Sequence, residues 1–140
     1  MISLDEAREL LETGIENDAL RKHMLAVSAI MGALADKLAI AEVDKEKWAV
    51  VGLLHDLDYE RTSDNFEKHG LITAELLNGK LPEECLDAIR AHNERTGSEP
   101  RSVMAKALIA ADAVSGLIVP TALMMPSRKL ADVRVTSLTK

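Results

Sequence analysis

The stretch "VVGLLHDLDYE" at residues 50–60 places a His-Asp pair at the end of an apolar run. Five of the seven residues from Val50 to Asp56 are apolar or glycine, which predicts the end of a buried helix. A histidine and a carboxylate in such a place need partners, because an unpaired polar group in a core costs roughly 2–7 kcal/mol. The partners of His55 and Asp56 are either ordinary hydrogen-bonding groups or a metal ion.

The composition limits the classes of protein that the chain can belong to. Its 140 residues suit one domain with a single core, so we expect residues 1–140 to form one domain. Seventeen basic and 23 acidic residues give a net charge of −6, and only 2% of residues are aromatic, which disfavours a nucleic-acid surface. The single cysteine, Cys85, excludes an intrachain disulfide and a multi-cysteine metal site.

Two segments bear on location in the cell. The N-terminus is acidic and amphipathic and lacks the pattern of a signal peptide, so we expect a cytoplasmic protein. Residues 107–125 are almost uncharged, but they contain Asp112 and Pro120. A carboxylate is costly inside a membrane, so we expect a buried central helix and no membrane partner.

Helix signals recur along the chain, and we predict an all-α fold of about six to seven helices. Ser3 and Glu6 form a capping box, Asn17 and Asp44 are candidate N-caps, and Pro82 stands at a first-turn position. No strong period-two alternation occurs before residue 131. The expected helices are 3–14, 17–38, 44–56, 66–79, 81–92 and 101–115, followed by a short apolar piece up to 126.

The segment 126–140 lies outside the expected core of about 17–125. Leu130, Val133, Val135 and Leu138 have no following element to pack against. We expect this tail to dock on the body or on a second copy in a homo-oligomer, or the natural chain to continue past it.

Histidine and aspartate recur on the apolar sides of the expected helices. A lone histidine on such a face is usually a hydrogen-bonded core residue. Buried carboxylates, however, are rare unless they are paired or bind metal, and no inward Lys or Arg is evident to pair with them. The set therefore favours a metal site. Its members are His23, His55, Asp56, His69, His92 and Asp112.

The ligand types indicate which metals the site would take. Imidazole and carboxylate without thiolate suit Mn, Fe, Co, Ni or Zn, and Mg is also compatible. One or two ions could be held. A bridging carboxylate can hold two ions about 3.5–4 Å apart, the arrangement used to hydrolyse phosphate esters.

The order of these residues resembles the HD-domain superfamily of metal-dependent phosphohydrolases. The resemblance covers about residues 17–119, in the string "HDLDYE … HG … AIRAHNE … AADAVSGLI". It implies an HD-type helical bundle around a metal site. It also implies hydrolysis of a small phosphorylated compound, a nucleotide above all, as a phosphomonoesterase or phosphodiesterase using metal-activated hydroxide. By position, His23, His55, Asp56 and Asp112 match a single-metal ligand set, and His69 and His92 match the additional ligands of two-metal members, with Asp56 as the bridge.

One position departs from the pattern of some members. Two-metal cyclic dinucleotide phosphodiesterases and diadenosine tetraphosphate hydrolases often carry a lysine four residues after the motif histidine, where this chain has Tyr59. A cation for phosphate would then come from Lys68, Arg95 or Arg128-Lys129, each of which is also compatible with a solvated surface charge. Asp58 is a candidate general acid or supporting carboxylate, with an exposed helix-end acid as the alternative, and Asn93 and Glu94 are candidate substrate contacts.

Three other functions stay open at this point. Similar proteins with six ligands hold two irons and oxidise small substrates with dioxygen, which needs no phosphate-binding lysine. A non-catalytic ligand-sensing module would keep the fold with a vestigial site. A plain helical bundle would satisfy its core histidines by hydrogen bonds alone.

Overall fold

Seven α-helices and four short 3₁₀ turns make up the computed structural model, which describes residues 1–40 and 42–139. These described residues contain no strand, and the all-α prediction is confirmed. The α-helices are α1 (Leu4–Gly14), α2 (Asp18–Lys37), α3 (Glu42–Leu54), α4 (Leu71–Leu76), α5 (Glu83–Ala91), α6 (Val103–Met124) and α7 (Val135–Leu138). The 3₁₀ turns are η1 (Tyr59–Arg61), η2 (Phe66–Lys68), η3 (Glu94–Thr96) and η4 (Leu130–Asp132).

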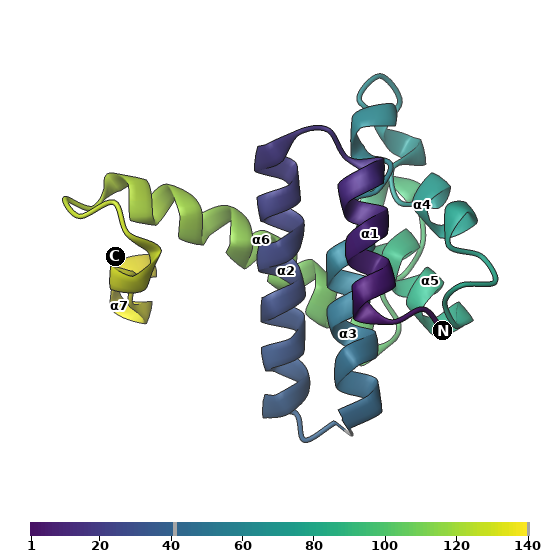
Figure 1. The fold of residues 1–140 in the computed structure, drawn as a ribbon, viewed down its shortest axis with the longest axis horizontal. Helices are drawn as coiled ribbons and strands as arrows, with labels where there is room; N and C mark the ends of the chain where they lie inside the picture. The colour runs from purple at the N-terminus through teal and green to yellow at the C-terminus, as the bar shows by residue number, and fades with distance from the viewer. Residues whose placement is uncertain (41, 140) are drawn as a thin grey trace.

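The first three helices lie side by side, with α4 and α5 on one flank and α6 crossing behind them (Figure 1). The closest approach is between α2 and α3, where Ser28 Oγ donates a hydrogen bond of 2.8 Å to the Ala49 carbonyl. Gly52 lies at this contact, and its missing side chain lets the two backbones approach. The packing of α2 on α3 brings His23 toward the end of α3.

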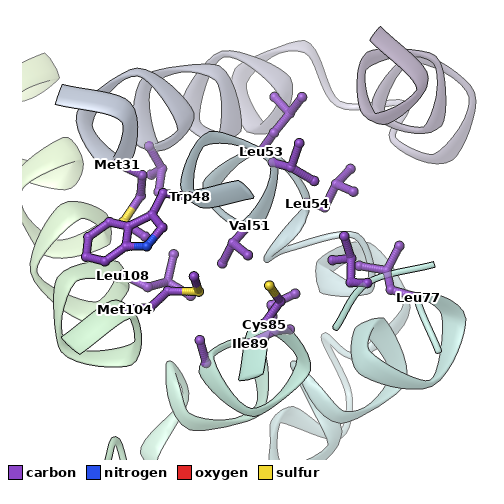
Figure 2. Packing of buried hydrophobic residues seen from close by; sticks show 14 of the residues in the cluster. Met31, Trp48, Val51, Leu53, Leu54, Leu77, Cys85, Ile89, Met104 and Leu108 are labelled. Atoms are coloured by element: carbon purple, nitrogen blue, oxygen red, sulfur yellow. The ribbon is translucent and has the colours of Figure 1, made fainter. Parts of the chain in front are cut away.

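Aliphatic and sulfur-containing side chains from most of the helices form one core (Figure 2). Trp48 is the one tryptophan of the chain and is buried there, together with Met31 of α2 and Leu108 of α6. Cys85 of α5 is fully buried, and burial raises the pKa of its thiol to about 11. The thiol is therefore protonated at neutral pH and packs as a small apolar group.

Helix boundaries agree with the capping signals at the N-terminal end and differ further along. Ser3 and Glu6 form the expected capping box, and the Asn17 side chain accepts from the Leu20 amide. The expected cap at Asp44 is wrong, because α3 already begins at Glu42. The expected helix over 66–79 is also wrong: Gly70 has a φ of +90°, which ends η2 and starts α4 in a new direction.

Helix α6 is longer than expected and continues through Pro120 to Met124. The helix fits the expectation of a buried central helix only in part, since Leu108 and Ser115 are buried while Leu117 and Leu123 are exposed. By length and composition it is one helix that could cross a membrane, and 22% of its most apolar window is buried. Its N-terminal half packs on α2 and α5.

The segment after α6 folds back on that helix. Both η4 and α7 contact α6, away from the first three helices (Figure 1). Leu130 and Val135 remain 59% and 75% exposed, so the docking covers little of their surface. The tail thus contacts α6, and a homo-oligomer contact stays a prediction.

The close approach at Gly52 generates a first prediction. A Cβ there would lie 2.9 Å from the Val27 carbonyl oxygen and 3.0 Å from the Ser28 Cα, both backbone atoms. Gly52→Ala should therefore push α3 away from α2 and lower the free energy of unfolding by about 1–3 kcal/mol. Urea denaturation with a chelator present measures the packing cost apart from any metal.

Gly116→Ala provides the matched control, because nothing lies within 4 Å of a Cβ at that position of α6. The control should leave stability unchanged or raise it by up to about 1 kcal/mol, since alanine favours a helix interior. Equal urea midpoints for Gly52→Ala and the parent chain would contradict the packing argument.

Candidate metal centre

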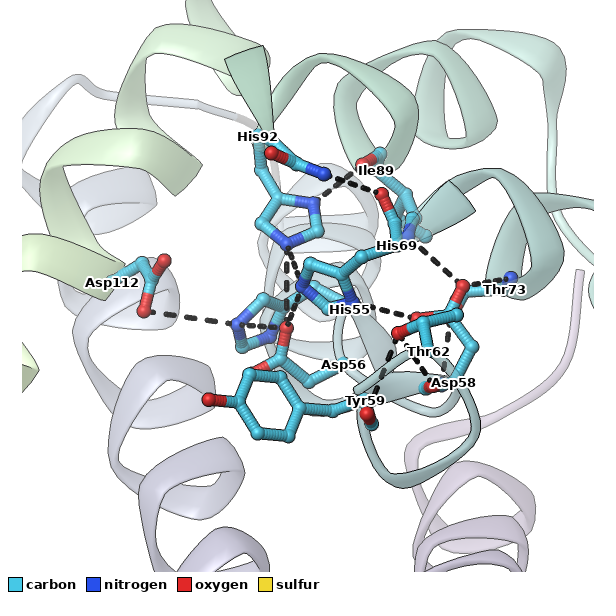
Figure 3. A network of polar contacts seen from close by, with 12 residues as sticks. His55, Asp56, Asp58, Tyr59, Thr62, His69, Thr73, Ile89, His92 and Asp112 are labelled. Carbon is cyan, nitrogen blue, oxygen red and sulfur yellow. Dashed lines mark hydrogen bonds and ion pairs between the residues drawn. The ribbon is translucent and has the colours of Figure 1, made fainter. Parts of the chain in front are cut away.

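The carboxylate of Asp56 lies among the imidazole rings of His55, His69 and His92 (Figure 3), and the ring of His23 reaches it as well. Its Oδ1 is 3.0 Å from His69 Nε2 and 3.3 Å from Nε2 of both His55 and His92. Its Oδ2 is 3.5 Å from His23 Nε2. All four rings thus present the same nitrogen to one carboxylate.

The ligands come from separate elements that the core packing brings together. His23 belongs to α2 and Asp112 to α6, and these two side chains lie 3.1 Å apart. His55 and Asp56 occupy the turn directly after α3, and His92 caps the C-terminus of α5. His69 was expected on a helix but lies in the bend between η2 and α4, where Gly70 turns the chain.

Each imidazole is held from behind through its Nδ1. His55 donates to the Gly52 carbonyl at 2.9 Å and His92 to the Ile89 carbonyl. His69 Nδ1 lies 2.8 Å from Asp58 Oδ1, and His23 Nδ1 lies 3.0 Å from Ser115 Oγ. A carbonyl oxygen can only accept, so Nδ1 of His55 and of His92 carries a proton, and in a neutral ring Nε2 then offers a lone pair to a metal.

Two features of the inner face favour a bound cation. Nε2 of His69 and Nε2 of His92 lie 3.0 Å apart, a distance that needs a proton or a metal ion between two nitrogen lone pairs. His55 Nε2 is fully buried and has no hydrogen-bond partner among the described residues. Leaving such an atom unsatisfied costs about 1–3 kcal/mol, which a metal–nitrogen bond would remove.

The pKa shifts of the histidines divide them into two kinds. Burial lowers the pKa of His55, so its ring is neutral. Hydrogen bonds to Asp112 and Asp56 raise the pKa of His23 to about 9. Burial opposes the charge on His69, but hydrogen bonds to Asp56 and Asp58 outweigh it and raise its pKa to about 9. Without metal, protons on His23 and His69 therefore neutralise the carboxylates.

The carboxylates show the reciprocal shifts. Burial alone would raise the pKa of Asp56, but its histidine neighbours outweigh burial and hold that pKa well below the ordinary value. Asp112 behaves in the same way, with burial opposed by the hydrogen bond from His23, and its pKa is lowered. Both groups are ionised at neutral pH and are competent metal ligands.

The spacing of the inward atoms fits transition-metal coordination. Neighbouring ligands around an ion with bonds of about 2.1 Å lie about 3 Å apart at right angles, close to the distances around Asp56. Two overlapping triads have ligand atoms within 4.8 Å of one another: His23, His55 and Asp112, and His55, Asp56 and His92. His69 adds a further nitrogen beside Asp56 and His92. The donor set therefore fits a divalent metal and could hold one ion or two.

Asp58 lies behind His69 and away from the inner face. Its side chain is fully buried, so the alternative of an exposed helix-end acid is wrong. One oxygen pairs with His69 Nδ1 and the other accepts from the amides of Gly70 and Thr73 at 2.9 and 2.8 Å. These bonds lower its pKa against the effect of burial. Asp58 is thus placed to orient His69 rather than to meet a substrate.

The structure separates the candidate substrate contacts. Lys68 is exposed on η2 and does not line the cavity described below. Arg95 places its guanidinium 5.8 Å from the centre of the Phe66 ring, also outside the cavity. Asn93 lines the cavity, but its amide donates to the Phe66 and His69 carbonyls and so braces the loop of His69. Arg128 and Lys129 are exposed on the tail and do not line the cavity either.

Several supporting residues were missed by sequence reasoning. Ser115 orients His23 from α6, three residues after Asp112, and was read only as part of an apolar helix. Thr73 both accepts from the Asp58 amide and donates its own amide to the Asp58 carboxylate. Phe66 stacks on His69 with ring centres 4.6 Å apart. The "HG" pair at 69–70 was the available signal, because glycine after a ligand marks a close backbone approach.

A cavity of about 1060 Å³ opens onto the inner face. His23, Asp56, His69, His92 and Asp112 line its inner end. Its walls include the apolar side chains of Leu20 and Ile109 and the rings of Tyr59 and Phe66. The volume suits a small organic molecule, with the polar cluster at one end.

The raised pKa values of His23 and His69 generate a prediction for the metal-free protein. A pKa of about 9 against an ordinary 6.5 means that the folded state holds these protons more tightly than the unfolded chain. This stabilisation is complete below pH 6.5 and is lost as the pH rises through 9. A shift of this size in one histidine is worth about 3 kcal/mol, so the free energy of unfolding with a chelator present should fall by at least about 3 kcal/mol between pH 6.5 and 9.5.

The same measurement with Mn²⁺ in place of the chelator is the comparison. Metal binding replaces the protons and strengthens as they leave, so the stability of the metal-loaded protein should not fall over this range. His23→Gln should remove part of the decline in the metal-free protein. A flat or rising stability of the metal-free parent from pH 6.5 to 9.5 would contradict the pKa shifts.

The comparisons with known proteins bear on the same residues. The family model described as "HD domain" matches residues 20–117, which include all six inward His and Asp positions. The searches of curated proteins and of solved structures gave no significant match. Members of this family bind divalent metals, in keeping with the donor set. The match covers well over half of the 140 residues, and the chain belongs to the HD domain family.

Proposed function

We propose that this HD domain is a metal-dependent phosphohydrolase that acts on a small phosphorylated compound. The observation that carries the proposal is the convergence of four imidazole Nε2 atoms on the Asp56 carboxylate at the inner end of an open cavity. Family membership supports hydrolase-type chemistry. Divalent ions bound there would activate water and stabilise negative charge on phosphoryl oxygens.

The position of each residue in the cluster suggests its role in metal binding. Asp56 lies between both groups of histidines and would bridge two ions, which makes it the catalytic residue of the proposal. His23, His55 and Asp112 would hold one ion, and His69 and His92 would hold the other together with Asp56. Asp58 is a positioning residue, because it acts through His69.

The cavity restricts which phosphorylated compounds fit. Tyr59 and Phe66 offer aromatic edges and faces to an organic group such as a nucleobase. The described lining contains no Lys or Arg, so no cationic side chain there would hold additional phosphates beyond the metal ions. Among nucleotides, a monophosphate therefore suits the cavity better than a di- or triphosphate.

A second candidate function is oxidation by a di-iron centre. His23, His55 and Asp112 form a set of two histidines and one carboxylate, and so do His69, His92 and Asp56. Two histidines and one carboxylate with open positions are typical of non-haem iron oxygenases. The lack of a cation in the described lining is also compatible with this chemistry, which does not transfer a phosphoryl group.

Location and assembly are separate expectations. A cytoplasmic protein, a small-molecule substrate in place of nucleic acid or membrane, and a homo-oligomer all stay predictions from the sequence.

Replacement of the ligands tests the metal centre. Asp56→Ala should abolish metal retention at both positions, whereas His55→Ala and His69→Ala should each lower the content from about two ions per chain to about one. Elemental analysis after dialysis against metal-free buffer measures this directly. Unchanged metal content in His55→Ala would refute the site.

Asp58→Asn tests the positioning role with little change in volume. Loss of the charge behind His69 should weaken Mn²⁺ binding by about 10- to 100-fold, while the helix content by circular dichroism is retained. Asp64→Asn is the control, because Asp64 is exposed in the loop before η2. Equal Mn²⁺ affinities for the two variants would remove Asp58 from the site.

The activity itself is tested with a panel of phosphomonoesters and phosphodiesters in the presence of Mn²⁺, Co²⁺, Ni²⁺ or Mg²⁺. Phosphate or alcohol release that is lost in Asp56→Ala is the expected result. If no substrate is hydrolysed, and aerobic iron loading gives a visible absorption band, the oxygenase alternative is favoured. Absence of both would leave a metal-binding module without catalysis and overturn the proposal.

A further inference from the structure

We propose that the cavity selects phosphorylated compounds whose organic part carries a positive charge, a protonated amine that the Glu94 carboxylate holds. The inference rests on the proposed function, because it assumes that the phosphoryl group occupies the metal end. It goes beyond that function by assigning the charge of the rest of the substrate and the residue that recognises it.

With the histidines neutral, as ligands of a metal must be, the charged side chains around the cavity are all acidic. Asp56 and Asp112 lie at the inner end, and Glu94 and Glu99 lie on the wall. None of the described lining residues is a lysine or an arginine. A cavity of this kind repels anions wherever a metal ion does not face them.

Metal ions would balance this charge without creating a surplus. Two divalent ions bring as many positive charges as the four lining carboxylates bring negative ones. The buried Asp58 adds a further negative charge behind His69. A phosphoryl group can therefore be held at the ions, but a second anionic group further along the cavity has no partner.

The inner end can be identified independently of the acidic wall. His55 Nε2 is fully buried, has no partner within the described residues, and belongs to the ring cluster around Asp56 (Figure 3). This atom marks where a metal and the reacting phosphoryl group would lie. The recognition group for the rest of the substrate must then come from the remaining wall of the cavity.

Glu94 is the wall carboxylate that is available for this role. It is exposed in η3, two residues after His92, and forms no ion pair within the described part of the chain. Glu99, in contrast, is already paired with Arg101, whose Nη2 lies 3.0 Å from its carboxylate. A cationic ligand would neutralise Glu94, which no side chain of the described structure does.

The aromatic side chains of the wall also favour a cation. Tyr59 lines the cavity, is 44% exposed, and packs nearly perpendicular to the rings of His69 and Phe66. Ring faces attract organic cations by about 0.5–1 kcal/mol at exposed sites. Arg95 packs on Phe66 and does not line the cavity.

The experiment uses three phosphonates of similar size that cannot be hydrolysed at the C–P bond by phosphoester chemistry. They are 3-aminopropylphosphonate, propylphosphonate and 3-phosphonopropionate, with a cationic, a neutral and an anionic tail. Titration calorimetry on the Mn²⁺-loaded protein measures the dissociation constant of each. We expect the amine to bind about tenfold more tightly than the carboxylate, with the neutral compound between them.

Glu94→Gln removes the charge and keeps the shape of the side chain. It should reduce the preference for the amine over the neutral compound by about two- to fivefold, as expected for one partly solvated ion pair. Glu75→Gln is the matched control, since Glu75 is exposed on α4 and outside the cavity, and should leave the preference unchanged.

The outcomes distinguish this inference from the proposed function. Tighter binding of the carboxylate or neutral compound, or an unchanged preference in Glu94→Gln, overturns the inference even if phosphoesters are hydrolysed. Failure of all three phosphonates to bind the Mn²⁺-loaded protein overturns it as well. The expected order of binding without hydrolysis of 2-aminoethyl phosphate upholds the charge selection and counts against hydrolysis alone.

Discussion

The Asp56 carboxylate among four imidazole rings is the constraint on which the rest of the structure depends. Each ring reaches it from a different element, and each is held at Nδ1 by a group on its own or a neighbouring element. A shift of one element against the others would lengthen or break some of these contacts. The relative placement of α2, α3, α5 and α6 is therefore tied to the geometry of one carboxylate.

Packing and chemistry share the same contacts in this fold. Gly52 lets α3 approach the backbone of α2, and its carbonyl also accepts from His55 Nδ1. Gly70 has the same double role, because its amide donates to Asp58 while its missing side chain leaves room for His92. Metal affinity and folding stability should therefore change together when either helix contact is altered.

The polarity of the molecule is arranged in a gradient from core to cavity. The aliphatic core ends at His55, the acidic and imidazole cluster follows, and the described cavity wall continues with aromatic and acidic side chains but no Lys or Arg. The positive charge at this site must accordingly come from protons, metal ions or the ligand. We therefore expect such a site to select ligands by their charge more strongly than by their shape.

The sequence by itself determined the helical class, the six inward His and Asp positions and the family, because helical periodicity and a short ordered motif are local properties of a chain. It could not show that the helix expected over residues 66–79 is interrupted at Gly70. Whether a glycine adopts a positive φ depends on its tertiary contacts, which the local sequence does not specify. It also could not decide whether Asp58 is an exposed acid at a helix end or a functional carboxylate. Only the tertiary structure shows that Asp58 is buried behind His69 and that Lys68 and Arg95 lie outside the cavity. These positions depend on which elements pack together in space.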